Sequence, residues 1–276
     1  MNNNDILQIP CIKNFIRMCS DGWYLGWHER NGGNLTYRMK VNEWEEIRRF
    51  FREPGEWVPM GVTAKNLAGE FFVTTGSGKY FRNMKEAPSE NLGIIEINGK
   101  GNAWRIVWGL ENGAKPTSEF PSHFLNHSVK KEATDGINRV IYHCHTPNII
   151  TLTYLRPLND RVFTRALWQS ATECPVVFPE GVGICPWMVP GGKDIAIATS
   201  EQMKKYPAVI WAQHGLFVSG ADFDTAFGLA HTIEKSAEIY RNVLSTGLPV
   251  HQTITDEALK AIACAFHVTL NSEFID

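Results

Sequence analysis

The sequence predicts a layered α/β fold made by a single domain that spans residues 1–276, and three observations support this. Segments with the alternation typical of strands and segments with the apolar spacing of helices follow one another along the whole chain. No long linker rich in proline, serine or glycine, no block of like charge and no internal repeat separates them. The chain has 276 residues, 43% of them hydrophobic, which is enough to bury a large core without disulfides.

The first half of the chain predicts helices and strands in mixed order. Apolar residues from Ile12 to Trp23 recur at helical spacing, and the glycines of Asn31–Asn34 end that helix. Alternating apolar residues predict a half-buried strand at Leu35–Met39. The further elements expected are a surface helix at Val41–Arg52, a strand at Glu70–Thr74, a hairpin of Gly93–Ile97 with Trp104–Trp108, and a helix containing Phe120 and Phe124 that Thr117 or Ser118 caps.

The second half continues in the same mixed way. A strand is expected at Val140–His145, followed by a helix that begins at Pro147. Two short apolar runs, Val176–Phe178 and Ala208–Trp211, are expected to be strands. The long segment Asp222–Leu244 predicts a helix with Asp222 as its N-cap, and a last helix is expected after Thr255 and Asp256.

Charge and composition exclude several classes of protein. The net charge of -2, from 27 basic and 29 acidic residues, leaves no basic surface of the kind that nucleic-acid binding needs. No signal-peptide pattern and no apolar run long enough to cross a membrane occurs in the sequence. The six cysteines are scattered without a C-x-x-C pair and are expected to be reduced and mostly buried. We therefore expect a cytoplasmic protein.

His143-Cys144-His145 carries the strongest chemical signal. On a strand the two histidines project from the same face, so their imidazoles can converge on one metal ion. The pattern alone is more typical of two buried, hydrogen-bonded histidines. His214, which follows the apolar run Ala208–Trp211 and precedes Gly215, supplies a third ligand at a strand end. Three histidines would form an open, catalytic zinc site rather than a closed structural one.

His123 and His127 are the competing metal pair, because they share one face of a predicted helix. The polar neighbours Asn126, Ser128 and Lys130 indicate a solvated surface there, which makes a metal site less favourable. His28, His231, His251 and His267 are expected to have structural roles.

Three polar loops and two carboxylates complete the candidate site. The loops are 32–34, 75–79 and 116–119, and their backbone N–H groups and hydroxyls can bind phosphate, although none of them matches a known nucleotide-binding motif. Each loop alone is more typical of an ordinary turn. Glu119, beside the third loop, can serve as a general base or only as a helix-terminal charge, and Glu173 is ambiguous in the same way.

At these residues the sequence resembles the class II sugar-phosphate aldolases over nearly its whole length. The matching segments are 26–36, 75–79, 116–119, 143–145, 178–183, 186–191 and 214–215. The resemblance implies a class II aldolase fold with a central mixed β-sheet flanked by helices on both faces. It also implies assembly into a C4 homotetramer.

The resemblance assigns the site residue by residue. It implies one zinc ion per subunit on His143, His145 and His214, with Glu119 as the catalytic carboxylate and Glu173 reaching the site of a neighbouring subunit. The implied phosphate contacts are Gly33, Asn34, Ser77, Gly78 and Ser118.

The implied reaction is the reversible cleavage of L-rhamnulose 1-phosphate into dihydroxyacetone phosphate and L-lactaldehyde, in rhamnose breakdown. A zinc-stabilised enediolate fits this chemistry, and it requires no Schiff-base lysine, so Lys79 is expected to face the phosphate. Two rival functions share the same residues. One is a pentulose-phosphate 4-epimerase, and the other is a catalytically silent sugar-phosphate-binding protein.

Overall fold

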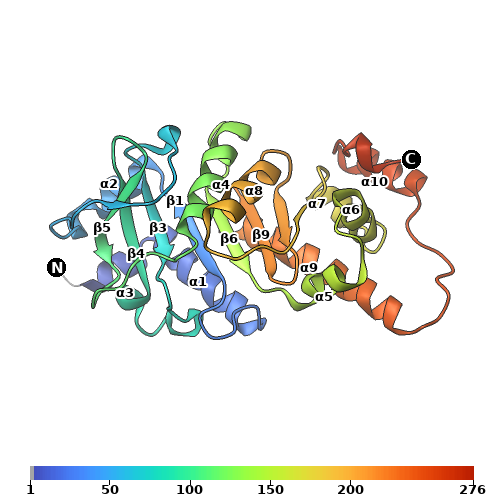
Figure 1. Cartoon of the computed structure of the whole chain (residues 1–276), viewed down its shortest axis with the longest axis horizontal. Helices are drawn as coiled ribbons and strands as arrows, with labels where there is room; N and C mark the ends of the chain where they lie inside the picture. Colours follow the sequence, from blue (N-terminus) through green and yellow to red (C-terminus); the bar gives the residue numbers. More distant parts are fainter. Residues whose placement is uncertain (1–2) are drawn as a thin grey trace.

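The central feature of the protein is one mixed β-sheet, seen in a computed structural model that describes residues 3–276 (Figure 1). Within these residues the sheet has nine strands in the order β2-β5-β4-β3-β1-β6-β9-β8-β7. All neighbouring strands are antiparallel except β7 and β8, which are parallel. The strands are β1 (Asn34–Arg38), β2 (Val58–Pro59), β3 (Phe71–Thr75), β4 (Leu92–Ile97), β5 (Ala103–Gly109), β6 (Val140–Cys144), β7 (Gly183–Cys185), β8 (Ala208–Trp211) and β9 (Gly215–Gly220).

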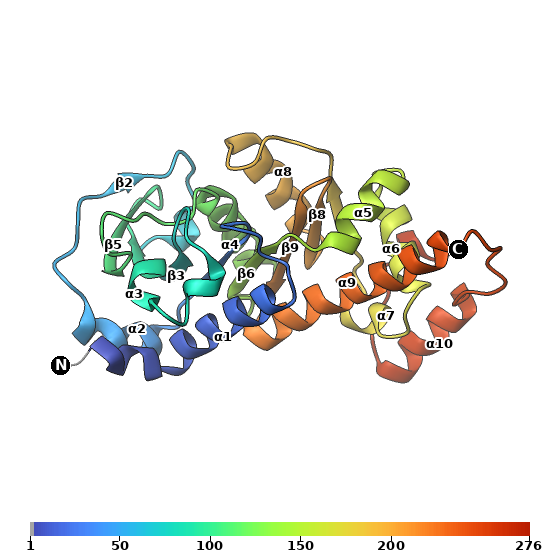
Figure 2. The ribbon, with the colours of Figure 1, turned by 90° about the horizontal axis from the view of Figure 1, so that it is seen from below.

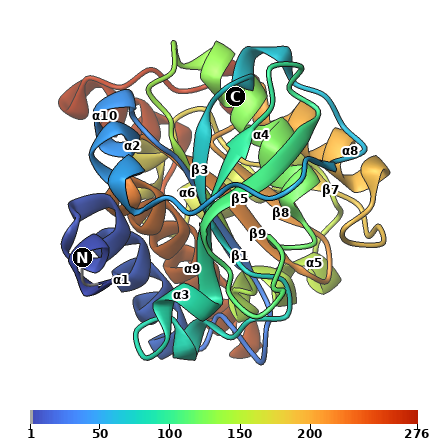
Figure 3. The ribbon, with the colours of Figure 1, turned by 90° about the vertical axis from the view of Figure 1, so that its left-hand side faces the viewer.

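Helices cover both faces of this sheet, which confirms the expected layered α/β fold. Viewed from its end, the sheet has α4 and α8 on one side and α1 and α9 on the other (Figure 3). Both α1 and the 23-residue α9 run along one side of the molecule when it is seen from below (Figure 2). The helices are α1 (Pro10–Tyr24), α2 (Val41–Ile47), α3 (Pro88–Asn91), α4 (Phe120–Ala133), α5 (Pro147–Leu155), α6 (Asp160–Trp168), α7 (Cys174–Val177), α8 (Lys193–Met203), α9 (Phe223–Ser245) and α10 (Asp256–Phe266).

Strand β6 shows how the two layers are built from alternating side chains. Tyr142 and Cys144 pack into the apolar core beneath α1 and α9. Ile141 points to the opposite face, where it packs with Trp211 and Phe217 in a second core under α4 and α8. Since side chains of a strand alternate between faces, His143 lies on the same face as Ile141. The first histidine of the H-x-H motif is therefore placed under α4.

Most of the expected elements are confirmed, and their caps explain where they begin. The side chain of Asp222 accepts a hydrogen bond from the backbone N–H of Thr225 at 2.7 Å, as an N-cap does, and α9 starts at the next residue. Thr255 caps α10 through the backbone N–H of Ala258 in the same way. The predicted hairpin is β4 paired with β5. Five of the six cysteines are buried and all are free, as expected.

Four local expectations were wrong. Val176–Phe178 is not a strand, because the segment from Cys174 to Val177 forms the short helix α7 with proline in its first turn. Strand β1 is not half-buried: every residue from Asn34 to Arg38 is buried, since helices cover both of its faces. Helix α4 begins at Phe120 with Glu119 as its N-cap residue, so neither Thr117 nor Ser118 occupies that position. The surface helix after Val41 is also shorter than expected and ends at Ile47.

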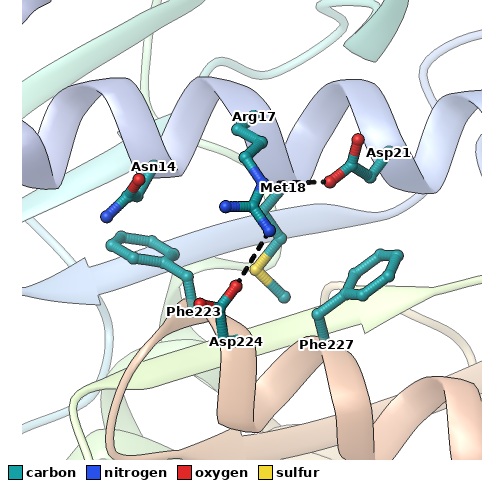
Figure 4. Close-up of a pocket in the computed structure, with 7 residues that line it drawn as sticks. All are labelled: Asn14, Arg17, Met18, Asp21, Phe223, Asp224 and Phe227. Carbon is teal, nitrogen blue, oxygen red and sulfur yellow. Dashed lines mark hydrogen bonds and ion pairs between the residues drawn. The ribbon is translucent and has the colours of Figure 1, made fainter.

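A small cavity of about 20 Å³ marks the contact between α1 and α9 (Figure 4). Arg17 reaches from α1 to Asp224 on α9 at 3.1 Å, and it also faces Asp21 of its own helix. All three side chains are exposed, so these ion pairs add little to stability. The cavity is far too small for a sugar phosphate, and the residues that line it form the contact between the two helices.

Among residues 3–276, no helix combines the length and apolar character needed to cross a membrane.

Candidate metal centre and active site

Three histidines from two neighbouring parts of the sheet converge at one point. His143 is on β6, His145 follows the end of the same strand, and His214 lies in the turn between β8 and β9. One nitrogen from each ring lies within 4.8 Å of the other two. The ring centroids are 5.1, 4.9 and 4.9 Å apart, so the rings form a nearly equilateral triangle. In the part of the chain that the structure describes, this is the one cluster found with such metal-ligand spacing.

The donor atoms of this triangle fit a metal ion. His143 Nδ1 lies 3.1 Å from the carbonyl oxygen of Leu216, which can only accept, so Nδ1 carries the proton and Nε2 keeps a lone pair. That Nε2 lies 3.3 Å from Nε2 of His214. Two nitrogens on one tetrahedral zinc, each bonded at about 2.0–2.1 Å, lie about 3.3–3.4 Å apart. The measured spacing is therefore that of two ligands of one ion.

The electrostatics keep two of these rings neutral. Burial, reinforced by the neighbouring imidazoles, holds the pKa of His143 well below its ordinary value. Burial also lowers the pKa of His214 to about 4. A neutral imidazole offers the lone pair that a metal needs, so His143 and His214 can bind a cation without first losing protons.

Each ligand is held in place by its own contacts. His143 stacks on Phe217 at 4.3 Å between ring centroids. His145 Nδ1 lies 2.7 Å from a carboxylate oxygen of Glu29, which leaves Nε2 free. The turn that carries His214 is fixed to α5, because the backbone N–H of Gln213 donates to the hydroxyl of Thr153 at 3.0 Å. Gln213, with φ of 56°, makes the left-handed turn before His214, so the turn does not depend on a positive φ at Gly215.

Gly215 is required for a different reason. A Cβ atom at this position would lie 2.4 Å from the carbonyl oxygen of Cys144 and 3.0 Å from Cε1 of His143. Glycine therefore lets β9 approach β6 closely enough to bring His214 beside His143.

An open cleft of about 540 Å³ gives access to the histidines. Its wall includes His145 and His214, Glu29, and the start of α5 at Pro147 and Ile150. A volume of this size is in the range of small-molecule sites.

Glu119 lies at the inner side of the histidine triangle. It is 8% exposed, and its Oε2 is 3.6 Å from Nε2 of His143. The side-chain amide of Asn34 donates a hydrogen bond to the same oxygen at 2.8 Å. Burial raises the pKa of Glu119, while the bond from Asn34 opposes that rise. The carboxylate can thus hold or release a proton next to the metal ligands, as a general base must.

The three polar loops meet as the sequence analysis expected. The backbone N–H of Ser77 donates to the carbonyl of Lys115 at 2.8 Å, and that of Thr117 donates to Thr75 at 2.9 Å. The hydroxyl of Thr75 accepts from the backbone N–H of Leu35 at 3.3 Å, which attaches the third loop. Ser77, Gly78 and Ser118 are exposed around this junction, and Gly33 is half-buried beside it. Asn34 is buried, and its amide is already engaged with Glu119.

The solvated surface expected at His123 and His127 is wrong. Both side chains are 0% exposed, because α4 packs against the sheet and against α8 beside it. The hydroxyl of Thr36 lies 2.8 Å from Nδ1 of His123 and 2.8 Å from Nε2 of His127. With the contact of His123 Nε2 to Asn34, both nitrogens of His123 and one of His127 are engaged, so the pair does not present a free nitrogen from each ring to a metal ion.

Glu173 lies elsewhere. It is exposed at the start of α7, outside the cleft of the histidines, and its carboxylate makes no hydrogen bond or ion pair among the residues described. Sequence reasoning had given no role to Glu29 or Thr36. The position of Glu29 shortly before the glycines of the 32–34 loop could have indicated its role, since an acidic side chain there can reach a neighbouring strand end.

Comparisons with known proteins identify the family of the chain. The family model described as Class II Aldolase and Adducin N-terminal domain matches residues 13–241. The chain therefore belongs to the class II aldolase family. It is 44% identical over 275 residues to rhamnulose-1-phosphate aldolase of Listeria innocua, covering 99% of this chain and 98% of that protein.

Two further relatives extend the comparison. Rhamnulose-1-phosphate aldolase of Yersinia pestis is 47% identical over 271 residues, covering 98% of both chains. Among solved structures, a sugar-phosphate aldolase from Thermotoga maritima aligns with a TM-score of 0.72 at 26% identity, covering 86% of this chain and 97% of that one.

Proposed function

We propose that the protein cleaves L-rhamnulose 1-phosphate reversibly into dihydroxyacetone phosphate and L-lactaldehyde. One observation carries the proposal: three imidazole nitrogens converge within 4.8 Å beside a buried carboxylate with a raised pKa. Relatives that are 44% and 47% identical and carry the name rhamnulose-1-phosphate aldolase support this sugar phosphate as the substrate. Residues 1–276 then form a single catalytic domain, because the site draws side chains from β1 to the β8–β9 turn.

The proposed cofactor is one zinc ion per subunit, bound by His143, His145 and His214. A bound zinc ion supplies Lewis acidity, which stabilises negative charge on substrate oxygens when the carbon–carbon bond breaks. The His145–Glu29 contact orients the His145 ring so that Nε2 faces the other two ligands. Phe217 and the carbonyl of Leu216 do the same for His143.

Glu119 is proposed to move one proton. In the condensation direction its carboxylate takes a proton from the hydroxymethyl carbon of dihydroxyacetone phosphate, and in the cleavage direction it returns that proton to the same carbon. The raised pKa favours this exchange, since a base works best when its pKa approaches the working pH. The amide of Asn34 fixes the orientation of the carboxylate.

The phosphate group is proposed to bind where the three loops meet. The exposed Ser77, Gly78 and Ser118 offer hydroxyls and backbone N–H groups, and Gly33 and Asn34 border the same junction. Such clusters of N–H groups hold anions without a basic surface. This mode of binding accommodates the net charge of -2.

We further propose a C4 homotetramer in which Glu173 completes the site of the neighbouring subunit. The exposed position of Glu173 leaves its carboxylate available to a neighbouring subunit, and two exposed apolar side chains at the end of α5, Tyr154 (70%) and Leu155 (54%), are candidates for burial between subunits. The proposed location is the cytoplasm, because a phosphorylated sugar carries charge and does not cross membranes.

Subunit mixing tests the tetramer. Glu119→Gln and Glu173→Gln chains are each expected to be inactive. If Glu173 acts across an interface, unfolding and refolding the two together will restore activity, because some mixed sites contain both carboxylates. No recovery in mixed tetramers, confirmed as mixed by mass, would refute action in trans.

Product analysis tests the reaction. The purified protein is incubated with L-rhamnulose 1-phosphate, and dihydroxyacetone phosphate is measured by a coupled reduction. We expect steady release of this product. Interconversion of pentulose phosphates without release would indicate the epimerase, and binding without turnover would indicate the silent binding protein.

A further inference from the structure

A chain of buried hydrogen bonds leads from Glu119 into the interior of the protein. It consists of Glu119, Asn34, His123, Thr36 and His127, and we name it the α4 relay because three of its members belong to α4 or its N-cap. Asn34 donates to Glu119 at 2.8 Å, and its side-chain oxygen contacts Nε2 of His123. The other nitrogen of His123 and one nitrogen of His127 share the hydroxyl of Thr36. The reaction proposed above uses only the first two members.

The donors and acceptors of the relay fit only one direction when Glu119 is ionised. A carboxylate only accepts, so Asn34 must turn its NH₂ group toward Glu119 and its oxygen toward His123. His123 Nε2 must then donate, which leaves its Nδ1 to accept from the hydroxyl of Thr36. That hydroxyl in turn accepts from Nε2 of His127. The three groups between the two ends, Asn34, His123 and Thr36, are thereby each both donor and acceptor in a consistent order.

The two rings stay neutral, as this order requires. Burial lowers the pKa of His123 to about 3 and holds that of His127 well below its ordinary value. A neutral ring has one donor and one acceptor nitrogen, and the amide oxygen of Asn34, which only accepts, makes Nε2 the donor in His123. The end of the relay agrees with this assignment, because Nδ1 of His127 is buried without a partner in the structure.

Losing this order has a direct chemical consequence. The two sides of an amide differ little in shape, so without a donor at His123 Nε2 the Asn34 side chain can rotate by 180°. Its oxygen would then face the carboxylate oxygen of Glu119, and the bond at 2.8 Å would become a repulsion. Glu119 would lose the contact that aims it toward the histidine triangle.

We propose that His123 is a positioning residue, whose Nε2–H holds the amide of Asn34 in the orientation that directs Glu119, and that the hydroxyl of Thr36, by donating to Nδ1 of His123, stabilises the tautomer needed for this. The inference rests on the role proposed above for Glu119. His123 touches neither the metal ligands nor the cleft, and it acts only through Asn34.

Two pairs of matched variants test the relay. His123→Gln places an amide nitrogen near the position of Nε2 and keeps the donor to Asn34, whereas His123→Asn reaches only the position of Nδ1 and loses it. Thr36→Ser keeps the hydroxyl, whereas Thr36→Val removes it with little change of shape. The second pair keeps the test decisive if the His123 variants fail to fold.

The expected result is a split between kcat and KM. His123→Asn and Thr36→Val should lower kcat by about 10- to 100-fold, which corresponds to one lost hydrogen bond to a charged group. KM and the metal content should remain within about three-fold of the unaltered enzyme, since neither the phosphate loops nor the histidine triangle is touched. His123→Gln and Thr36→Ser should keep kcat within about three-fold.

Other outcomes would overturn the relay. Equal losses of kcat in both members of a pair, or a change in KM alone, would show that His123 and Thr36 contribute only to packing. The double variant His123→Asn with Thr36→Val should be no slower than His123→Asn alone, and multiplied losses would contradict action through one chain. If Glu119→Gln retains activity, the base assignment fails, and that result is separate from any result on the matched pairs.

Discussion

Replacing Glu119 by Gln isolates the proton transfer from every other property of the site. Glutamine has nearly the same shape, and its side-chain oxygen can keep the 2.8 Å bond from Asn34. The substitution removes the basic group that lies 3.6 Å from Nε2 of His143. Loss of a general base lowers the rate by about 10²–10⁴-fold, so we expect kcat to fall by this amount.

The same variant makes a prediction about stability, and its sign follows from the pKa. Burial raises the pKa of Glu119, which means that the ionised side chain is less favourable in the folded protein than in the unfolded one. A neutral glutamine should therefore leave the free energy of unfolding unchanged or higher at neutral pH.

The assay measures dihydroxyacetone phosphate release, bound metal and the denaturant midpoint on one preparation. Glu90→Gln, an exposed site on α3, serves as the control for removing a negative charge. Full activity of Glu119→Gln with its metal in place would refute the assignment of the base. A large loss of stability would refute the electrostatic argument.

The remaining predictions concern the metal ligands and the buried histidines. His145→Ala should lose bound metal as measured by elemental analysis, and a full metal complement would contradict the ligand assignment. Glu29→Gln should weaken zinc affinity by about 10- to 100-fold in a competition titration with a chelator, because it removes the carboxylate that orients His145; unchanged affinity would show that the contact does not matter. Burial lowers the pKa of both His28 and His123 to about 3, against an ordinary value of 6.5, so the unfolded chain takes up protons first as the solution is acidified. The free energy of unfolding should therefore fall by about 1 kcal/mol per ring as the pH is lowered from 7 to 5.5. Denaturant midpoints of the metal-free protein that stay constant over this range would contradict the burial of the two rings in neutral form.

Sequence alone was sufficient where a local pattern determines the structure. The apolar spacing of α1 and the capping aspartate of α9 depend on residues close together in the chain, and both elements formed as predicted. The alternation rule also placed His143 correctly on one face of a strand. The convergence with His214 followed, because β6 and β9 are neighbours in the sheet.

Tertiary packing decided what the sequence could not show. Asn126 and Lys130 predicted a solvated face on α4, yet they are 0% and 5% exposed because the helix is covered by α8. That covering buried His123 and created the α4 relay, which joins residues up to 91 positions apart. Likewise, the apolar run at 176–178 was too short for its period to distinguish a strand from the turn of helix that it forms.

Metal removal and restoration test the central claim most directly. The purified enzyme is stripped with a chelator, and release of dihydroxyacetone phosphate from L-rhamnulose 1-phosphate is followed while zinc is added back. We predict that the stripped enzyme is inactive and that activity returns in full at one zinc ion per chain. Full activity without metal, or restoration that does not saturate at one ion per chain, would contradict a reaction that depends on the site formed by His143, His145 and His214.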